Sequence, residues 1–220
     1  MTIANYAAVV LAGYLIGSIP FGLLVSLMTS GADLRQVGSG KTGTTNVLRT
    51  AGKKAAALAL ILDMAKGALP VLLARLVFNG DYHIAQLLAG LSVIAGHSWS
   101  VFLKFKGGRG VATFLGGMLA MYWPAAIFGG AIMIIVAYVS KYMSLGSITG
   151  SVAASAMLVI LYILKSYPTE YLIYTIYTLS VAIFIFIMHR DNVIRLVNGK
   201  ERKLGDKVKT SNSLPTINPE

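Results

Sequence analysis

Long apolar runs separated by short polar stretches dominate the chain. The runs extend over about 3–28, 55–78, 83–103, 112–139, 143–164 and 171–189. Each has roughly the 20 residues that an α-helix needs to cross a hydrocarbon core of about 30 Å. The pattern therefore predicts an all-α, polytopic integral membrane bundle of helices.

The basic residues mark one face of the predicted membrane. They follow the first, third and last runs in three clusters: Arg35, Lys41, Arg49, Lys53 and Lys54; Lys104, Lys106 and Arg109; and Arg190, Arg195, Lys200, Arg202, Lys203, Lys207 and Lys209. The loops between these clusters carry Asp81 and Glu170 instead. Because Lys and Arg concentrate in cytoplasmic loops, we expect all three clusters on the cytoplasmic side.

The run 112–139 decides the number of crossings. If it crossed once, three crossings would separate the second basic cluster from the third and would place the C-terminus outside. The run holds Trp123-Pro124 at its middle, and an interfacial tryptophan beside a proline suits a turn at the outer surface. A split there predicts about seven transmembrane helices, with the N-terminus outside and the C-terminus cytoplasmic. Each half is shorter than the usual ~20 residues.

Composition agrees with a membrane protein and excludes several chemistries. Of the 220 residues, 56% are hydrophobic and 12% are charged, whereas about a quarter are charged in soluble domains. The net charge of +11 would suggest nucleic acid as the partner of a soluble protein. Here it indicates cytoplasmic loops and attraction to anionic membrane lipids, with no nucleic-acid partner. The chain has no cysteine and therefore no thiol nucleophile or thiolate metal site.

Residues 1–199 form the predicted single transmembrane domain. The N-terminus lacks the basic n-region and small-residue cleavage site of a signal peptide, so the run 3–28 is interpreted as a retained span. After about Lys200 the chain is polar, and residues 200–220 are expected to form a disordered cytoplasmic tail.

The polar stretch after the first run resembles a phosphate-binding loop. Gly38-Ser39-Gly40-Lys41-Thr42-Gly43 satisfies G-x-G-x-x-G, but a Walker A motif would need glycine where Arg35 stands, and no strand precedes the stretch. A soluble nucleotide-binding loop is therefore excluded. Backbone N–H groups close to cations still favour anion binding over an ordinary basic loop. The small and polar residues gathered here are Gly38, Gly40, Thr42, Gly43, Thr44, Thr45 and Asn46.

A second glycine-rich stretch leads directly into an apolar run. Gly107-Gly108-Arg109-Gly110 precedes a helix that begins near Ala112, and Lys104 and Lys106 lie just before it. Helix N-terminal amides and cationic side chains both attract phosphate, so the stretch predicts a phosphate nest. The alternative is a flexible hairpin that carries cytoplasmic charges.

Polar residues also occur where the last run ends and within the second run. His189, at the end of the last run, is consistent either with a helix C-cap or with a catalytic or substrate-orienting role, and Asn192 follows it. Asp63 and Lys66 lie three residues apart in an apolar run, where charged residues usually face the bundle interior. We expect them to pair with each other; alternatively, Asp63 orients a basic residue of the site.

Four blocks of the sequence resemble the bacterial acyl-phosphate:glycerol-3-phosphate acyltransferase family. The family patterns are G-S-G-N-x-G-A-T-N-V-x-R, D-x-x-K-G-x-x-P-V, G-H-x-F-P-V-F-L-x-F-K-G-G-K-G-V-A-T and H-R-x-N-I-x-R-L-x-x-G-x-E. Counterparts occur in this order within residues 38–49, 63–71, 96–113 and 189–201. Three departures stand out: Lys41 replaces asparagine, Arg109 replaces lysine, and Trp99-Ser100 replaces Phe-Pro. Arg109 keeps the charge as a planar fork, whereas Lys41 adds a charge to the first loop.

The resemblance implies a seven-span enzyme and a role for each matched residue. Catalytic roles fall to Ser39, Arg49, His189 and Asn192. Substrate binding falls to Gly38, Gly40, Gly43, Thr45, Asn46, Lys104, Gly107, Gly108, Arg109, Gly110 and Thr113. Supporting roles fall to Asp63, Lys66, His97, Arg195 and Glu201. No metal or other cofactor is implied.

The implied reaction transfers a fatty acyl group from acyl phosphate to the 1-hydroxyl of sn-glycerol 3-phosphate. It yields lysophosphatidic acid and phosphate at the cytoplasmic face of the bacterial cell membrane, and an enzyme that forms acyl phosphate is the implied functional partner. A transporter for phosphorylated anions is the main alternative, but no internal repeat is visible. A scaffold or lipid-binding protein would leave the glycine-rich blocks unexplained.

Overall fold

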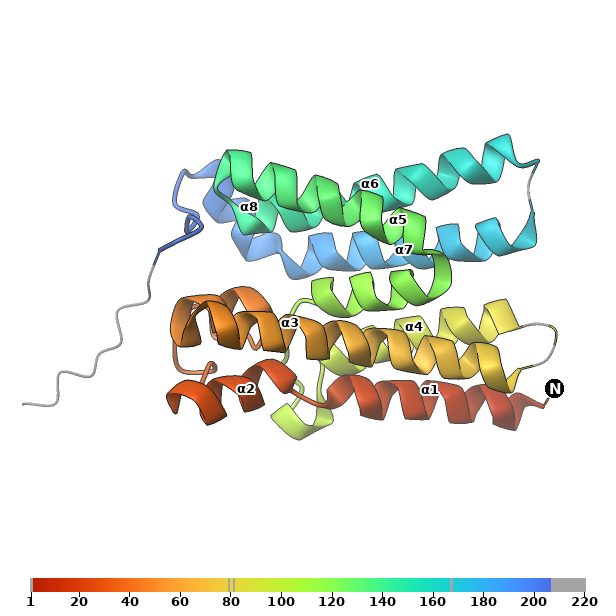
Figure 1. Cartoon of the computed structure of the whole chain (residues 1–220), viewed down its shortest axis with the longest axis horizontal. Coiled ribbons are helices and arrows are strands. Elements are labelled where there is room, and N and C mark those ends of the chain that lie inside the picture. The colour runs from red at the N-terminus through yellow and green to blue at the C-terminus, as the bar shows by residue number, and fades with distance from the viewer. Residues whose placement is uncertain (1, 79, 81, 167, 207–220) are drawn as a thin grey trace, which may run out of the picture.

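The computed structural model of the chain is a helical bundle (Figure 1). It describes residues 2–78, 80, 82–166 and 168–206. Its helices are α1 (Ile3–Ser18), α2 (Phe21–Ser30), α3 (Thr44–Val77), α4 (Tyr82–Ser98), the 3₁₀ turn η1 (Val101–Leu103), α5 (Val111–Ser140), α6 (Met143–Leu164), α7 (Thr169–Met188) and α8 (Arg190–Val197). The predicted all-α class is confirmed. Six stretches within these residues are long and apolar enough to span a membrane.

Helix α5 is a hairpin rather than one long span. Its backbone leaves helical geometry at Tyr122 (φ −151°, ψ 88°), directly before Trp123-Pro124. The two halves then run back along each other (Figure 1), and a Cβ on Gly130 would lie 3.9 Å from a methyl carbon of Leu115. In a straight helix those residues would be about 22 Å apart. The split predicted from charge parity is therefore confirmed, and the first half is short.

Two other helices differ from the predicted runs. The run 3–28 is interrupted at Ile19-Pro20, where α1 ends and α2 begins. Proline at this point removes a backbone donor and restricts the residue before it, which accounts for the break. Helix α3 begins at Thr44, well before the predicted residue 55, because a short first segment joins the long one across Gly52 (φ 84°).

Small residues allow the helices to approach closely. A Cβ on Gly116 of α5 would lie 1.9 Å from the carbonyl oxygen of Met64 in α3. A Cβ on Gly17 of α1 would lie 2.2 Å from the carbonyl oxygen of Val93 in α4. Because no side chain fits at such contacts, glycine sets the helix spacing, as expected for membrane bundles. Large apolar side chains such as Ile134 and Ile183 are more than half exposed, on surfaces that lipid would solvate.

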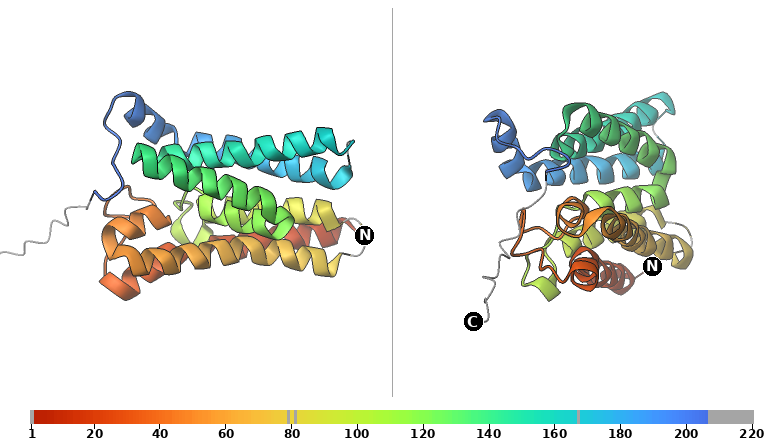
Figure 2. Two further views of the ribbon diagram at one scale, coloured as in Figure 1. Left: turned by 45° about the horizontal axis from the view of Figure 1, so that its top comes forward. Right: turned by 60° about the vertical axis from the view of Figure 1, so that its left-hand side comes forward.

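The two ends of the bundle differ in chemistry. The first residues of α1 lie at one end, while α2, the loop that follows it and α8 lie toward the other (Figures 1 and 2). Two of the predicted basic clusters thus share one end, opposite the N-terminus. Their assignment to the cytoplasmic side remains a prediction.

Candidate active site

A cavity of about 260 Å³ gathers residues from all three predicted polar segments. Its polar lining comprises Ser39, Lys41, Gly43, Thr44, Thr45, Asn46, Arg49, Asp63, His97, Arg109, Gly110, Ser144, Ser147, His189, Asn192 and Glu201. Its apolar lining comprises Leu60, Val111, Ala112, Leu115, Met133, Ile134 and Met143. The cavity therefore has a polar part for charged groups and an apolar part between helices.

Asn46 organises the first loop from within. Its side-chain amide donates to the carbonyl oxygens of Leu34 (3.2 Å), Val37 (3.1 Å) and Lys41 (2.9 Å). Its own oxygen accepts from the backbone N–H of Ser39 at 3.2 Å. Because its donors and its oxygen are engaged within the loop, Asn46 shapes this loop beside the cavity that it lines, and its predicted contact with substrate stays a prediction.

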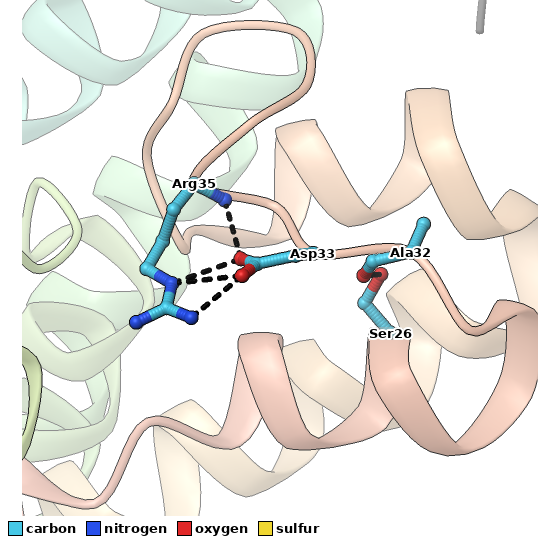
Figure 3. Close-up of polar contacts among 4 residues, drawn as sticks. All are labelled: Ser26, Ala32, Asp33 and Arg35. Atoms are coloured by element: carbon cyan, nitrogen blue, oxygen red, sulfur yellow. Dashed lines mark hydrogen bonds and ion pairs between the residues drawn. The ribbon is translucent and has the colours of Figure 1, made fainter.

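The start of the same loop is fastened outside the cavity. Arg35 forms an ion pair with Asp33, with Nη2 and Oδ2 separated by 2.6 Å, and Ser26 Oγ donates to the Ala32 carbonyl at 2.8 Å (Figure 3). The hydrogen bonds from Arg35 outweigh partial burial and lower the pKa of Asp33. Gly38 and Gly40 turn the loop with left-handed φ values of 65° and 69°, and neither lines the cavity.

Gly107 and Gly108 pack closely against the end of α4. Their amides donate to the carbonyls of Ser98 (3.0 Å) and His97 (3.1 Å). A Cβ on Gly107 would lie 2.1 Å from the His97 carbonyl oxygen, and one on Gly108 would lie 2.1 Å from His97 Nε2. These two amides already have carbonyl partners, so among the residues of the predicted nest those from Arg109 onward line the cavity, and the substrate-binding role of Gly107 and Gly108 stays a prediction.

Arg109 and the first turn of α5 give one part of the cavity the features of an anion site. Gly110 (φ 82°) caps α5, and Gly110, Val111 and Ala112 line the cavity with first-turn amides that have no intrahelical partner. Arg109 Nε is buried without a hydrogen-bond partner among the described residues. Burial, and then repulsion from Arg195, lower the pKa of Arg109. A half-buried guanidinium with an unpartnered Nε is stabilised by an anion.

Two predicted phosphate ligands lie elsewhere. Lys104 is exposed on the loop before Gly107 and does not line the cavity. Thr113 is fully buried, and its carbonyl oxygen would lie 2.1 Å from a Cβ on Gly67 of α3. Thr113 therefore belongs to the contact between α3 and α5, and the predicted substrate contacts of Lys104 and Thr113 stay predictions.

His189 presents an unprotonated nitrogen at neutral pH. Its Nδ1 lies 2.8 Å from the carbonyl oxygen of Ile185, and because a carbonyl only accepts, Nδ1 must carry the proton. Burial, followed by repulsion from Arg109, lowers the pKa of His189 to about 4. Nε2 is therefore available as a hydrogen-bond acceptor in the cavity.

Glu201 connects helices α6 and α8 at the cavity wall. It accepts from Asn192 Nδ2 (2.6 Å), Ser144 Oγ (2.9 Å) and Arg195 Nε (2.8 Å). Burial opposes its charge, but these hydrogen bonds outweigh burial and lower the pKa of Glu201. The oxygen of Asn192 is buried and has no hydrogen-bond partner in the described chain, so it can accept from a substrate hydroxyl.

The segment that carries Glu201 was expected to be disordered. Residues 200–206 instead cross the cavity end of the bundle: the Arg202 carbonyl accepts from Arg49 Nη2 (3.4 Å) and Leu204 N–H donates to the Lys141 carbonyl (2.7 Å). We call residues 200–206 the strap. The expectation for residues 207–220 lies outside the described residues.

Asp63 and Lys66 pair within α3, as predicted. Asp63 Oδ1 lies 2.8 Å from Lys66 Nζ and 3.8 Å from His97 Nδ1. Lys66 also donates to the carbonyl of Ile19 (2.7 Å), where α1 ends, and it does not line the cavity. The ion pair therefore connects the cavity wall at Asp63 to the break between α1 and α2, where Lys66 donates to Ile19.

Sequence reasoning missed several cavity residues. Ser144 and Ser147 were not proposed, and Lys41 and Thr44 were noted without an assigned role. The two serines lie three residues apart on the first turns of α6, directly after Lys141. This spacing places them on one face of the helix beside a cation, and it is the sequence feature that could have indicated them as cavity residues.

The fold and the cavity define a helical integral membrane protein whose cavity is lined by the cations Lys41, Arg49 and Arg109. A family model described as glycerol-3-phosphate acyltransferase matches residues 7–199. The chain belongs to the glycerol-3-phosphate acyltransferase family.

Similar proteins agree over nearly the whole chain. Glycerol-3-phosphate acyltransferase 3 of Dehalococcoides mccartyi (strain CBDB1) is 52% identical over 95% of this chain and 100% of its own length. The glycerol-3-phosphate acyltransferase of Caulobacter vibrioides (strain NA1000 / CB15N) is 43% identical, over 90% and 87% respectively. The crystal structure of PlsY, an integral membrane glycerol 3-phosphate acyltransferase, in its glycerol 3-phosphate form superposes with a TM-score of 0.80 at 35% identity, covering 91% of this chain and 96% of PlsY. The lysophosphatidic acid form gives 0.77 at 33%, covering 90% and 95%.

Proposed function

We propose that the protein transfers a fatty acyl group from acyl phosphate to the 1-hydroxyl of sn-glycerol 3-phosphate. The products are 1-acyl-sn-glycerol 3-phosphate and inorganic phosphate, in the first acylation of phospholipid synthesis. The reaction takes place at the cytoplasmic face of a bacterial plasma membrane. Its donor is supplied by an enzyme that forms acyl phosphate.

The charge balance of the cavity carries this proposal. Both lining carboxylates are already paired, Asp63 with Lys66 and Glu201 with Arg195. Lys41, Arg49 and Arg109 are left without carboxylate partners among the described residues, and they line one cavity beside a neutral histidine. Three cations suit two phosphate groups, which repel each other unless they are neutralised.

Each substrate has a place that its chemistry favours. The phosphate of glycerol 3-phosphate fits Arg109 and the first-turn amides of α5. The acyl phosphate head fits the Ser39 loop and Arg49, and its acyl chain fits the apolar lining between the helices. Holding both substrates in one cavity converts a bimolecular encounter into a positioned reaction.

The reaction follows from this placement. The 1-hydroxyl oxygen of glycerol 3-phosphate attacks the acyl carbonyl carbon and forms the ester C–O bond. The bond between the acyl carbon and the phosphate oxygen then breaks, and phosphate leaves with the electron pair. Ser39 and Arg49 stabilise the developing oxyanion and the leaving phosphate. The anhydride is already activated, so no covalent enzyme intermediate is needed.

The hydroxyl proton has two possible acceptors. One is Nε2 of His189, which is unprotonated at neutral pH, and Asn192 orients the hydroxyl. The other is the phosphate of glycerol 3-phosphate itself, in which case His189 orients the hydroxyl. In either route the proton then passes to the departing phosphate, which leaves as hydrogen phosphate, and the acceptor returns to its starting state.

The donor is tested with purified protein, labelled glycerol 3-phosphate and one acyl donor at a time. Palmitoyl phosphate should yield labelled lysophosphatidic acid and an equal amount of phosphate. If only acyl-CoA or acyl-carrier protein supported product formation, the donor assignment would be wrong. If no donor did, the reaction itself would be excluded.

A further inference from the structure

The loop of residues 99–106 lies outside the cavity and projects from the bundle. It follows α4, is drawn in yellow-green, and lies beside the junction of α1 and α2 (Figures 1 and 2). Ser100 Oγ donates to the carbonyl of Ser18, the last residue of α1, at 2.6 Å. The carbonyl of Trp99 accepts from the hydroxyl of Tyr14 in α1 at 2.8 Å. We call residues 99–106 the outer loop.

The outer loop combines exposed aromatic side chains with cations. Trp99 is 47% exposed, Phe102 61% and Phe105 61%. Lys104 and Lys106 are exposed, and neither forms an ion pair within the described residues. No Asp or Glu occurs between Asp81 and Glu170 in the sequence. The chain therefore supplies no nearby acid in sequence to neutralise these two lysines.

The backbone fixes this arrangement in an unfavourable conformation. Lys104 (φ 51°) and Phe105 (φ 61°) are consecutive left-handed residues, although neither is glycine. Hydrogen bonds from Phe105 N–H to the Ser100 carbonyl (2.8 Å) and from Lys106 N–H to the Leu103 carbonyl (3.1 Å) hold the turn. Such strain persists where the surrounding structure imposes it, often at sites of function.

The position of the outer loop suits the membrane surface. The apolar span Tyr82–Leu103 ends directly before Lys104. Tryptophan is enriched where a membrane meets water, and lysines beside a span extend their ammonium groups toward the headgroups. Anionic lipids attract basic residues at this depth.

We propose that the outer loop is a binding site for an anionic phospholipid of the surrounding bilayer. Lys104 and Lys106 contact the lipid phosphate region, and Trp99, Phe102 and Phe105 contact its glycerol and upper acyl chain. The site is separate from the catalytic cavity, because neither lysine lines that cavity. Lys104 and Lys106 belong to the stretch 96–113 that resembles a family pattern, and the proposed reaction does not use them. The lipid site gives these two lysines a role.

The two tryptophans of the chain provide a direct test. In a Trp123→Phe variant, Trp99 is the only tryptophan, and its fluorescence reports lipids in contact with the outer loop. The protein is reconstituted in phosphatidylcholine bilayers of two kinds. In one, a fraction of the phosphatidylcholine carries brominated chains; in the other, the brominated lipid is added phosphatidylglycerol. Bromine atoms quench tryptophan fluorescence at short range, so the two samples compare the lipids at Trp99. We expect phosphatidylglycerol to be preferred over phosphatidylcholine at Trp99 by at least about fivefold. One lysine near an anionic surface contributes ~1 kcal/mol, which corresponds to that ratio.

Matched variants locate the source of the preference. Lys104→Gln/Lys106→Gln should bring the ratio of the two lipids close to one. Lys53→Gln/Lys54→Gln, which changes two exposed lysines of α3, should leave it unchanged. In a Trp99→Phe protein the reporter is Trp123, beside the turn of α5 near the end where the chain begins, and it should show no preference (Figure 1).

Three results would overturn the proposal. They are a ratio near one at Trp99, a preference that survives Lys104→Gln/Lys106→Gln, and a preference that is lost equally in the Lys53/Lys54 control. If Lys104→Gln/Lys106→Gln does not fold, the Trp123→Phe protein is titrated with salt. The preference should then fall as salt rises, because screening weakens contacts between exposed charges, and a salt-independent ratio would contradict the site.

Discussion

A single hydrogen bond determines which nitrogen of His189 carries the proton and which is left unprotonated. The contact with the Ile185 carbonyl places the proton on Nδ1, and the low pKa keeps the ring neutral. Both proposed routes for the hydroxyl proton require this tautomer: Nε2 accepts the proton in one and accepts a hydrogen bond in the other. The protonation state of His189 is therefore a prediction at the scale of one residue.

We predict that His189 titrates with a pKa of about 4, below its ordinary 6.5. The sequence has only three histidines, so ¹⁵N-histidine NMR of the purified protein follows each ring, and His189→Gln assigns its signal. Since the folded state disfavours the charged ring, the associated stability is present above pH 6.5 and is lost as pH falls toward 4. Titration near 6.5 would show that the imidazole is not buried as described.

The packing glycines give a second prediction at this scale. Gly107→Ala places a methyl group 2.1 Å from a backbone oxygen that has little freedom to move, whereas a Cβ on Gly43 (φ −76°) meets nothing within 4 Å. Gly107→Ala should destabilise the protein by about 2 kcal/mol and lower its unfolding temperature by roughly 5 °C. Gly43→Ala should leave that temperature unchanged within error. Equal melting curves for the two variants would refute the packing role.

The sequence predicted many of the residues that line the cavity, but not which partner each of their polar groups has. The motif stretches place Ser39, Arg49, Arg109 and His189 around one cavity, as the resemblance implied. Sequence alone does not show where a backbone amide donates: the glycine-rich stretch predicts phosphate ligands in Gly107 and Gly108, whose amides donate to Ser98 and His97. The same limit applied to Asn46, because its partners are carbonyl groups of the loop it encloses.

At the scale of elements, the strap depends on contacts between segments far apart in the sequence. Polar composition favoured disorder from residue 200, yet Glu201 has partners on α6 and α8, and Leu204 pairs with Lys141. The turn within α5 was predictable, because charge parity and Trp123-Pro124 both indicated it. The break at Ile19-Pro20 was not predicted, because the apolar run continues through it without a charge.

Two truncations test the strap. A chain ending at Gly199 loses Glu201 and leaves Asn192 and Arg195 without their shared partner. One unpaired buried polar group costs ~1.4 kcal/mol, so kcat/KM should fall by about tenfold or more. A chain ending at Asp206 keeps the strap contacts that the structure describes and should retain activity within about twofold. Equal activity in the two chains would remove the strap from the working site.

At the scale of the whole molecule, the lengths of the apolar runs and the positions of the charges predicted the architecture, because a bilayer permits few backbone structures within its hydrocarbon core. Every backbone group in the hydrocarbon core must be satisfied within the chain, so apolar runs of this length form helices. Charge parity then required an even number of crossings between Arg109 and Arg190, which the α5 hairpin supplies. Which end faces the cytoplasm remains a prediction.

The orientation is tested by single cysteines, which the natural sequence lacks. Trp123→Cys at the α5 turn should react with an impermeant maleimide on intact cells. Lys53→Cys and Val197→Cys, both at exposed positions, should react only after permeabilisation. The reverse pattern would invert the topology, and labelling of all three in intact cells would contradict a fixed orientation.

The central claim is that Arg109, with the first turn of α5, holds the phosphate of glycerol 3-phosphate inside the cavity. It is tested most directly by steady-state rates with palmitoyl phosphate for Arg109→Ala and Lys104→Ala, two cations five residues apart. We predict that Arg109→Ala lowers kcat/KM for glycerol 3-phosphate by ~100-fold, or about 2.7 kcal/mol, while Lys104→Ala stays within about twofold of the natural protein. Equal losses in the two variants, or a loss confined to Lys104→Ala, would contradict the account.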